Sequence, residues 1–194
     1  MPKGRLEAFS DGVIAILITI MVLDLHLPDG TTWHALGKEV PVLLAYLLSF
    51  IMLGIYWNNH HHMLAAVSRT SGAALWANLH LLFWLSLIPF TTPWMSENDY
   101  AQVPVAVYGI VLLICGLAYL ILQQTLLRVE GRDSMLAQAT GHDLKGRGTA
   151  LLYILGIGLS FLDRWLGVAA YVLVALVWLV PDRRIERTLA STER

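Results

Sequence analysis

Charged residues are scarce in this chain. Asp, Glu, Lys and Arg make up 14% of its 194 residues, whereas soluble globular domains contain about 25%. Long uncharged apolar runs alternate with short polar connectors, which excludes a water-soluble enzyme and is typical of a multi-pass α-helical membrane protein. The runs are continuously apolar, without the residue-by-residue alternation of a porin-type barrel.

Cysteine is also nearly absent. The single Cys115 lies inside an apolar run, so the chain has neither a disulfide framework nor a cysteine metal cluster. A net charge of −1 gives no indication of a nucleic-acid partner. No nucleophile–base pair, phosphate-binding glycine loop or paired-carboxylate site stands out, so we expect no enzyme and no cofactor.

Apolar residues, in contrast, make up 57% of the chain. Since a span needs about 20 mainly apolar residues, we predict an all-α integral membrane protein with six transmembrane helices in a single domain, residues 1–194. The predicted spans are 5–25, 40–57, 70–92, 101–127, 149–162 and 165–180. The last two are short, and a shallow hairpin is the alternative. The first could be a secretory signal peptide, but no small-residue cleavage site follows it.

The positive charges predict the orientation. With the N-terminus in the cytoplasm and six alternating spans, only Lys38 and Arg164 of the 13 Lys and Arg residues fall outside. An excess of Lys and Arg on the cytoplasmic side is the rule in membrane proteins. We therefore expect a multi-pass protein of the cell (inner) membrane, surrounded by the lipid bilayer, with both termini in the cytoplasm.

The first span carries the charged residues that are hardest to explain. Arg5 and Glu7 can mark its cytoplasmic end, but Asp11 directly precedes an unbroken apolar run, and ionisable groups at membrane depth usually face a bundle interior or water. A helical wheel at about 100° per residue places Asp11 about 140° from Ile16. The stripe that includes Ile16 consists of Arg5, Gly12, Ile16, Thr19 and Leu23.

Asp11 therefore faces different neighbours from this stripe. The candidate partners on other helices are Trp76, Asn78 and His80. From pattern alone, the stripe itself would be ordinary packing or lipid contact.

Three consecutive histidines, His60 to His62, suggest a metal site. Consecutive helical residues point about 100° apart, however, and no other His or Cys lies three or four residues away. We therefore predict no metal site.

The start of the chain matches a recognisable pattern. Arg5 to Asp11 read R-x-x-x-F-S-D, followed by Gly12 to Ile16 and a threonine three residues later. This resembles the signature that opens the first helix of the transmembrane protein 175 family of potassium channels. Tyr56 to His61 and Leu87 to Thr91 also fit the family, whereas spans four to six agree only in number and spacing.

The resemblance implies a potassium-selective cation channel of the prokaryotic, single-repeat form. Such a chain assembles as a homotetramer, and its first helices line a central pore through which K⁺ passes. The resemblance places the constriction at Ile16 and the next pore-facing layers at Thr19 and Leu23. The residues that hold the pore helix against its neighbours would be Arg5, Phe9, Ser10 and Asp11.

The sequence has no T-V-G-Y-G-type filter loop, so a ring of Ile16 side chains would act as a hydrophobic neck. Two other functions remain open. A proton-coupled secondary transporter could use Asp11 and His80 as a proton relay, although no broken helix is expected. A non-conducting membrane scaffold also agrees with the composition.

Overall fold

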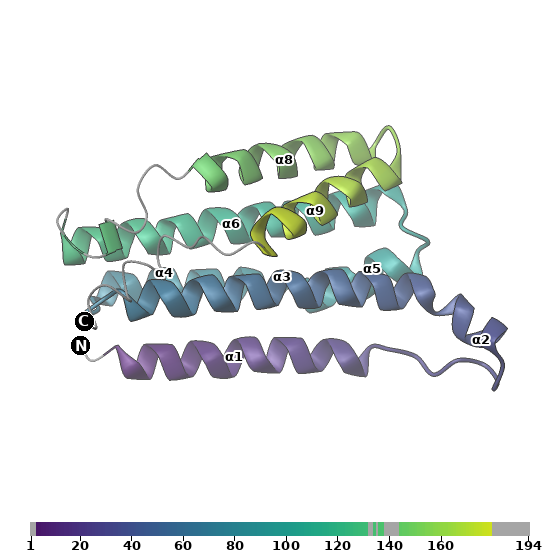
Figure 1. Cartoon of the computed structure of the whole chain (residues 1–194), viewed down its shortest axis with the longest axis horizontal. Coiled ribbons are helices and arrows are strands. Elements are labelled where there is room, and N and C mark those ends of the chain that lie inside the picture. Colours follow the sequence, from purple (N-terminus) through teal and green to yellow (C-terminus); the bar gives the residue numbers. More distant parts are fainter. Residues whose placement is uncertain (1–2, 132–133, 135, 138–143, 180–194) are drawn as a thin grey trace.

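The chain forms a bundle of helices in the computed structural model (Figure 1). The structure describes residues 3–131, 134, 136–137 and 144–179, and these contain no strand. Their helices are α1 (Gly4–Leu23), α2 (Trp33–Lys38), α3 (Val40–Ala65), α4 (Gly72–Leu85), α5 (Ile88–Glu97), α6 (Gln102–Glu130), α8 (Leu144–Ser160) and α9 (Arg164–Leu179). The predicted all-α class is confirmed for this part. The C-terminal arginines used for the topology lie outside the described residues.

Four helical segments are long and apolar enough to cross a membrane, and they overlap the first four predicted spans. They are Gly4–Leu23, Val40–Ala65, Gly72–Glu97 and Gln102–Glu130, with 20, 26, 26 and 29 residues. The second continues past its predicted end at residue 57, because polar side chains in its last turns find partners on α1 and α4. The first segment packs against α3, α4 and α5.

The third predicted span, 70–92, is not one continuous helix. α4 ends at Leu85 and α5 begins at Ile88. Pro89 lies in the first turn of α5, where its missing N–H is tolerated, but in a continuous helix its ring would clash with the carbonyl of Leu85. Ser86 and Leu87 between them keep αR backbone angles, so the interruption is a tight turn and not an unwound stretch. α4 and α5 together form one helical segment of 26 residues, the length of a membrane crossing.

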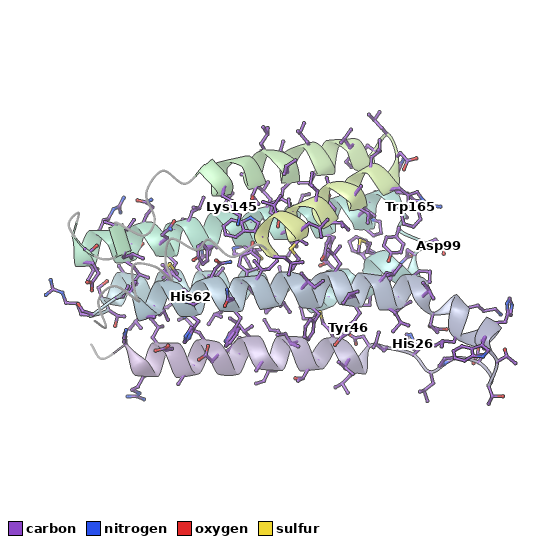
Figure 2. All side chains as sticks on the ribbon, viewed as in Figure 1. His26, Tyr46, His62, Asp99, Lys145 and Trp165 are labelled. Carbon is purple, nitrogen blue, oxygen red and sulfur yellow. The ribbon has the colours of Figure 1, made fainter. Side chains whose placement is uncertain are left out.

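The last two apolar runs form an antiparallel hairpin. α8 and α9 have 17 and 16 residues, which corresponds to about 25 Å each against a hydrocarbon core of about 30 Å. The tip reaches the connection between α5 and α6: Arg164 Nη1 donates to the Asp99 carbonyl at 2.7 Å, and Gln102 Nε2 donates to the Phe161 carbonyl at 3.2 Å. Figure 2 shows Asp99 and Trp165 at this same end of the bundle.

Close packing of α9 against α6 and α8 depends on two glycines. Tyr171 of α9 is fully buried, and its hydroxyl donates to the Val105 carbonyl at 3.2 Å. Gly109 of α6 and Gly156 of α8 face its ring, and a Cβ atom at either position would overlap that ring. Small residues allow membrane helices to approach closely in this way.

Gly109→Ala is expected to lower the stability of the protein by about 1–3 kcal/mol, because the added methyl group overpacks the Tyr171 site. The measurement is thermal unfolding of the purified protein in detergent. Gly158→Ala is the control, since a Cβ at Gly158 has no neighbour within 4 Å. Equal unfolding midpoints for the two variants would contradict the close packing.

Candidate functional site

α1 has one face packed into the bundle and one face left open. The packed face repeats every three or four residues, as helix geometry requires, and consists of Leu6, Ser10, Ile14, Leu17 and Met21. On the other face Ile16 is 57% exposed and Leu23 is 83% exposed, and Gly12 and Thr19 are exposed as well. The stripe predicted from the helical wheel therefore lies on the open face of α1.

A buried polar chain joins the packed face of α1 to two other helices. Asn78 Nδ2 of α4 donates to Ser10 Oγ at 2.9 Å, and Ser10 Oγ donates to the Leu6 carbonyl at 2.8 Å. Asn78 Oδ1 lies 2.7 Å from His60 Nε2 of α3, and the histidine donates because an amide oxygen only accepts. Buried polar groups are costly unless they are paired. This Ser10–Asn78–His60 network therefore favours one rotation of α1 about its axis.

A second polar contact lies one residue further along α1. Trp57 Nε1 of α3 donates to Asp11 Oδ1 at 3.0 Å. The Trp57 ring stacks on His61 with 5.9 Å between the ring centroids, and His61 Nδ1 lies 3.5 Å from Glu7 Oε1. The two carboxylates of α1 thus face α3, away from the Ile16 stripe.

The N-terminal end of α1 is attached to the C-terminal end of α3. Lys3 Nζ donates to the carbonyls of Leu64 and Ala65 at 2.9 and 3.1 Å. These are among the last carbonyls of α3, where the helix dipole favours a positive charge. These bonds therefore fix the position of α1 along its own axis relative to α3.

The partner of Asp11 differs from the prediction. Of the three candidate partners, Asn78 does reach α1, but it bonds Ser10 and leaves Asp11 to Trp57. Residues two apart on a helix point about 200° apart. With Asn78 facing α1, Trp76 is therefore 75% exposed and His80 accepts a hydrogen bond from Trp84 of its own helix.

The four residues predicted to hold the pore helix fall into two groups, one bonded to other helices of this chain and one exposed. Ser10 and Asp11 bond neighbouring helices, as their predicted role requires. Arg5 is exposed and Phe9 is 53% exposed, so their role as holding residues stays a prediction that depends on neighbours outside the chain.

The three consecutive histidines diverge, as expected for one helix. His60 points to Asn78, and His61 points to Glu7. Among the residues that the structure describes, no three His, Cys, Asp or Glu side chains are grouped to hold a metal ion. The partners of His60 and His61 lie on α4 and α1.

Sequence reasoning missed Trp57 and His60 as anchors of α1. Both lie in the segment Tyr56 to His61 that fits the family pattern, so that segment was the available signal. Spacing gives no indication of these contacts, since Trp57 and Asp11 are 46 positions apart.

Trp57→Phe is expected to destabilise the protein by roughly 1 kcal/mol, because the ring is kept while the hydrogen bond to Asp11 is lost. Thermal unfolding in detergent measures this. Trp76→Phe is the matched control, since Trp76 is largely exposed, and we expect it to change stability by less than about 0.5 kcal/mol. A smaller effect at Trp57 than at Trp76 would show that the bond to Asp11 contributes nothing.

Comparison with known proteins gives consistent matches. Residues 5–89 match the family described as endosomal/lysosomal potassium channel TMEM175. A potassium channel of Chryseobacterium sp. is 52% identical over 189 residues, covering 97% of this chain and 98% of the relative. A potassium channel of Streptomyces collinus is 37% identical over 189 residues, covering 91% of each.

A solved structure shows the same fold. The crystal structure of a lysosomal potassium-selective channel TMEM175 homolog from Chamaesiphon minutus matches with a TM-score of 0.81 and 30% sequence identity. The match covers 92% of this chain and 96% of that chain. Both the sequence and the fold of this chain therefore match these channels over nearly the whole length. The chain belongs to the TMEM175 family of potassium channels.

Proposed function

We propose that this chain forms a potassium-selective cation channel, a homotetramer in which four α1 helices surround a central pore. The observation that carries the proposal is the open face of α1. Ile16, Thr19 and Leu23 are exposed there, while polar contacts hold the opposite face against α3 and α4. A helix held this firmly on one side presents a fixed stripe to whatever lies on its other side.

The proposed constriction is a ring of four Ile16 side chains. Branched apolar side chains around a narrow axis exclude water, and an ion passes only after losing part of its hydration shell. K⁺ holds its water less tightly than the smaller Na⁺, so this barrier favours K⁺. Selectivity then comes from dehydration at an apolar neck, without a ring of backbone carbonyls.

Thr19 follows Ile16 by about 4.5 Å along the helix axis. Its hydroxyl donates to the Ile16 carbonyl at 2.9 Å, which leaves the oxygen lone pairs free to accept or to coordinate. Directly beyond the neck, four Thr19 hydroxyl oxygens would replace some of the water molecules that a partly dehydrated cation has lost. Leu23 forms the next apolar layer toward the outer mouth, where Asp24 and Asp29 would raise the local cation concentration.

Ser10, Asp11, Trp57, His60 and Asn78 are positioning residues in this proposal. They touch neither the ion nor the axis, and they set the rotation of α1 that directs Ile16 to the pore. We further propose that the α8–α9 hairpin crosses the inner membrane of the cell with its tip outside, as the predicted topology requires. The position of the tip beside Asp99 supports this.

The test is ion flux into proteoliposomes containing the purified chain, together with the mass of the detergent-solubilised particle by light scattering. We expect a fourfold protomer mass, and K⁺ flux that exceeds Na⁺ flux and needs no proton gradient. Saturable flux coupled to a proton gradient would indicate a secondary transporter. Absence of flux would indicate a scaffold.

A further inference from the structure

A cavity lies away from α1, where α3, α6, α8 and α9 meet. Its volume is about 120 Å³, close to the roughly 150 Å³ of an engineered cavity that binds benzene in another protein. Four aromatic side chains contribute to its wall: Tyr56, Tyr119, Tyr153 and Trp178. The size and the lining both suit one compact ring.

One polar side chain of the wall lacks a partner. Gln123 of α6 is only 9% exposed and lines the cavity, and within the described part of the chain its amide makes no hydrogen bond. Other polar groups of the wall are paired: the Tyr56 hydroxyl donates to the Leu112 carbonyl at 3.3 Å, and Trp178 Nε1 donates to Thr149 Oγ1 at 2.7 Å.

The Gln123 amide carries two donors and one acceptor. Its atoms keep accessible surface, because His60 Nδ1 is the one fully buried side-chain atom without a partner among the described residues, so the amide is available to a ligand in the cavity. The unmet hydrogen-bonding capacity of this cavity is thus concentrated at Gln123, surrounded by aromatic rings.

We propose that this cavity binds a compact, uncharged aromatic molecule with one hydrogen-bonding group, of which indole is the simplest example. The ring would pack edge-to-face against the tyrosines and Trp178, an arrangement that aromatic pairs prefer. The N–H group would donate to the Gln123 side-chain oxygen. Such molecules dissolve in a bilayer and reach a site between membrane helices from the lipid phase.

Lys145 restricts the charge of the ligand. Its Nζ lies 4.7 Å from the centroid of the Trp178 ring, so a positive charge lies behind one aromatic side chain of the wall, near the end of α9; Figure 2 labels Lys145. A cationic ring compound would meet repulsion there, whereas a neutral compound does not. The wall contains no residue of α1, so this binding site is separate from the proposed pore and its test does not depend on conduction.

The test is fluorine NMR titration of the purified protein in detergent with a fluorinated indole and with its N-methyl derivative, which lacks the donor. For the wild type we expect saturable binding that is about fivefold to tenfold weaker for the N-methyl compound. Gln123→Leu should bind both probes equally, because the group that distinguishes them is gone. Equal affinity of both probes for the wild type would overturn the proposal.

A second pair of variants separates the cavity from nonspecific uptake by the micelle. Ala150→Phe adds a ring inside the cavity wall and should abolish saturable binding of both probes. Leu151→Phe, at the next position but 58% exposed, should retain it. Binding unchanged by a folded Ala150→Phe protein would overturn the proposal, and if that variant does not fold, the two-probe comparison with Gln123→Leu decides.

Discussion

Replacing Ile16 by asparagine is expected to raise the potassium conductance of the reconstituted channel about tenfold and to reduce its preference for K⁺ over Na⁺. A polar side chain at the neck stabilises water and a hydrated ion where isoleucine excludes them. A barrier lowered by about 1.4 kcal/mol corresponds to a factor of ten. Single-channel recording in planar bilayers gives the conductance, and reversal potentials in mixed K⁺ and Na⁺ solutions give the selectivity.

The matched control is Ile154→Asn. Ile154 of α8 is 56% exposed against 57% for Ile16, so the same substitution is made at the same exposure on a helix outside the proposed pore. We expect it to leave conductance and selectivity unchanged. If both variants conduct like the wild type, Ile16 does not face the pore. If both change alike, the effect belongs to the asparagine and not to the position.

Replacing Asn78 by leucine is expected to destabilise the protein by roughly 2 kcal/mol and to reduce the yield of the assembled oligomer. The substitution removes the partner of His60 Nε2 and a donor to Ser10 Oγ at once. His60 Nδ1 already lacks a partner among the described residues, so the ring would keep no hydrogen bond. Loss of one partner of a buried pair costs about 1–3 kcal/mol for the group left behind.

Thermal unfolding and light scattering measure both effects. Asn98→Leu is the control, because Asn98 is exposed at the end of α5 and surface changes stay within about 0.5 kcal/mol. The double variant His60→Leu with Asn78→Leu should recover part of the lost stability, since it removes the buried group that Asn78→Leu leaves unpaired. A double variant less stable than Asn78→Leu would contradict this account of the network.

Much of α1 is predictable from its sequence. Residue spacing on a helix has a fixed angle, so Ile16, Thr19 and Leu23 fall on one side whatever surrounds them. Hydropathy likewise predicts the first four spans, because the bilayer imposes a length on every crossing. Neither argument identifies neighbours, and for that reason the three candidate partners of Asp11 do not include Trp57, which bonds it, while Asn78 bonds Ser10 instead.

The turn between α4 and α5 in the third predicted span shows a second limit of sequence-based prediction. Apolar composition continues from α4 into α5 and predicts one helix, whereas Pro89 separates them through a local steric clash. The proline was visible in the sequence, and its effect depended on whether the helix would kink or end there. The structure ends α4 at Leu85 and begins α5 at Ile88.

Scarcity of charge and the lengths of the apolar runs determine by themselves that this protein belongs in a membrane, and the opening motif determines its family. The tertiary structure alone decides which face of α1 stays open, because the Ser10–Asn78 bond joins residues 68 positions apart. It also decides that α3, α6, α8 and α9 line a cavity with Gln123 in its wall. Hydropathy and periodicity are properties of neighbouring residues in the chain, whereas hydrogen-bond partners and cavities depend on how separate helices pack.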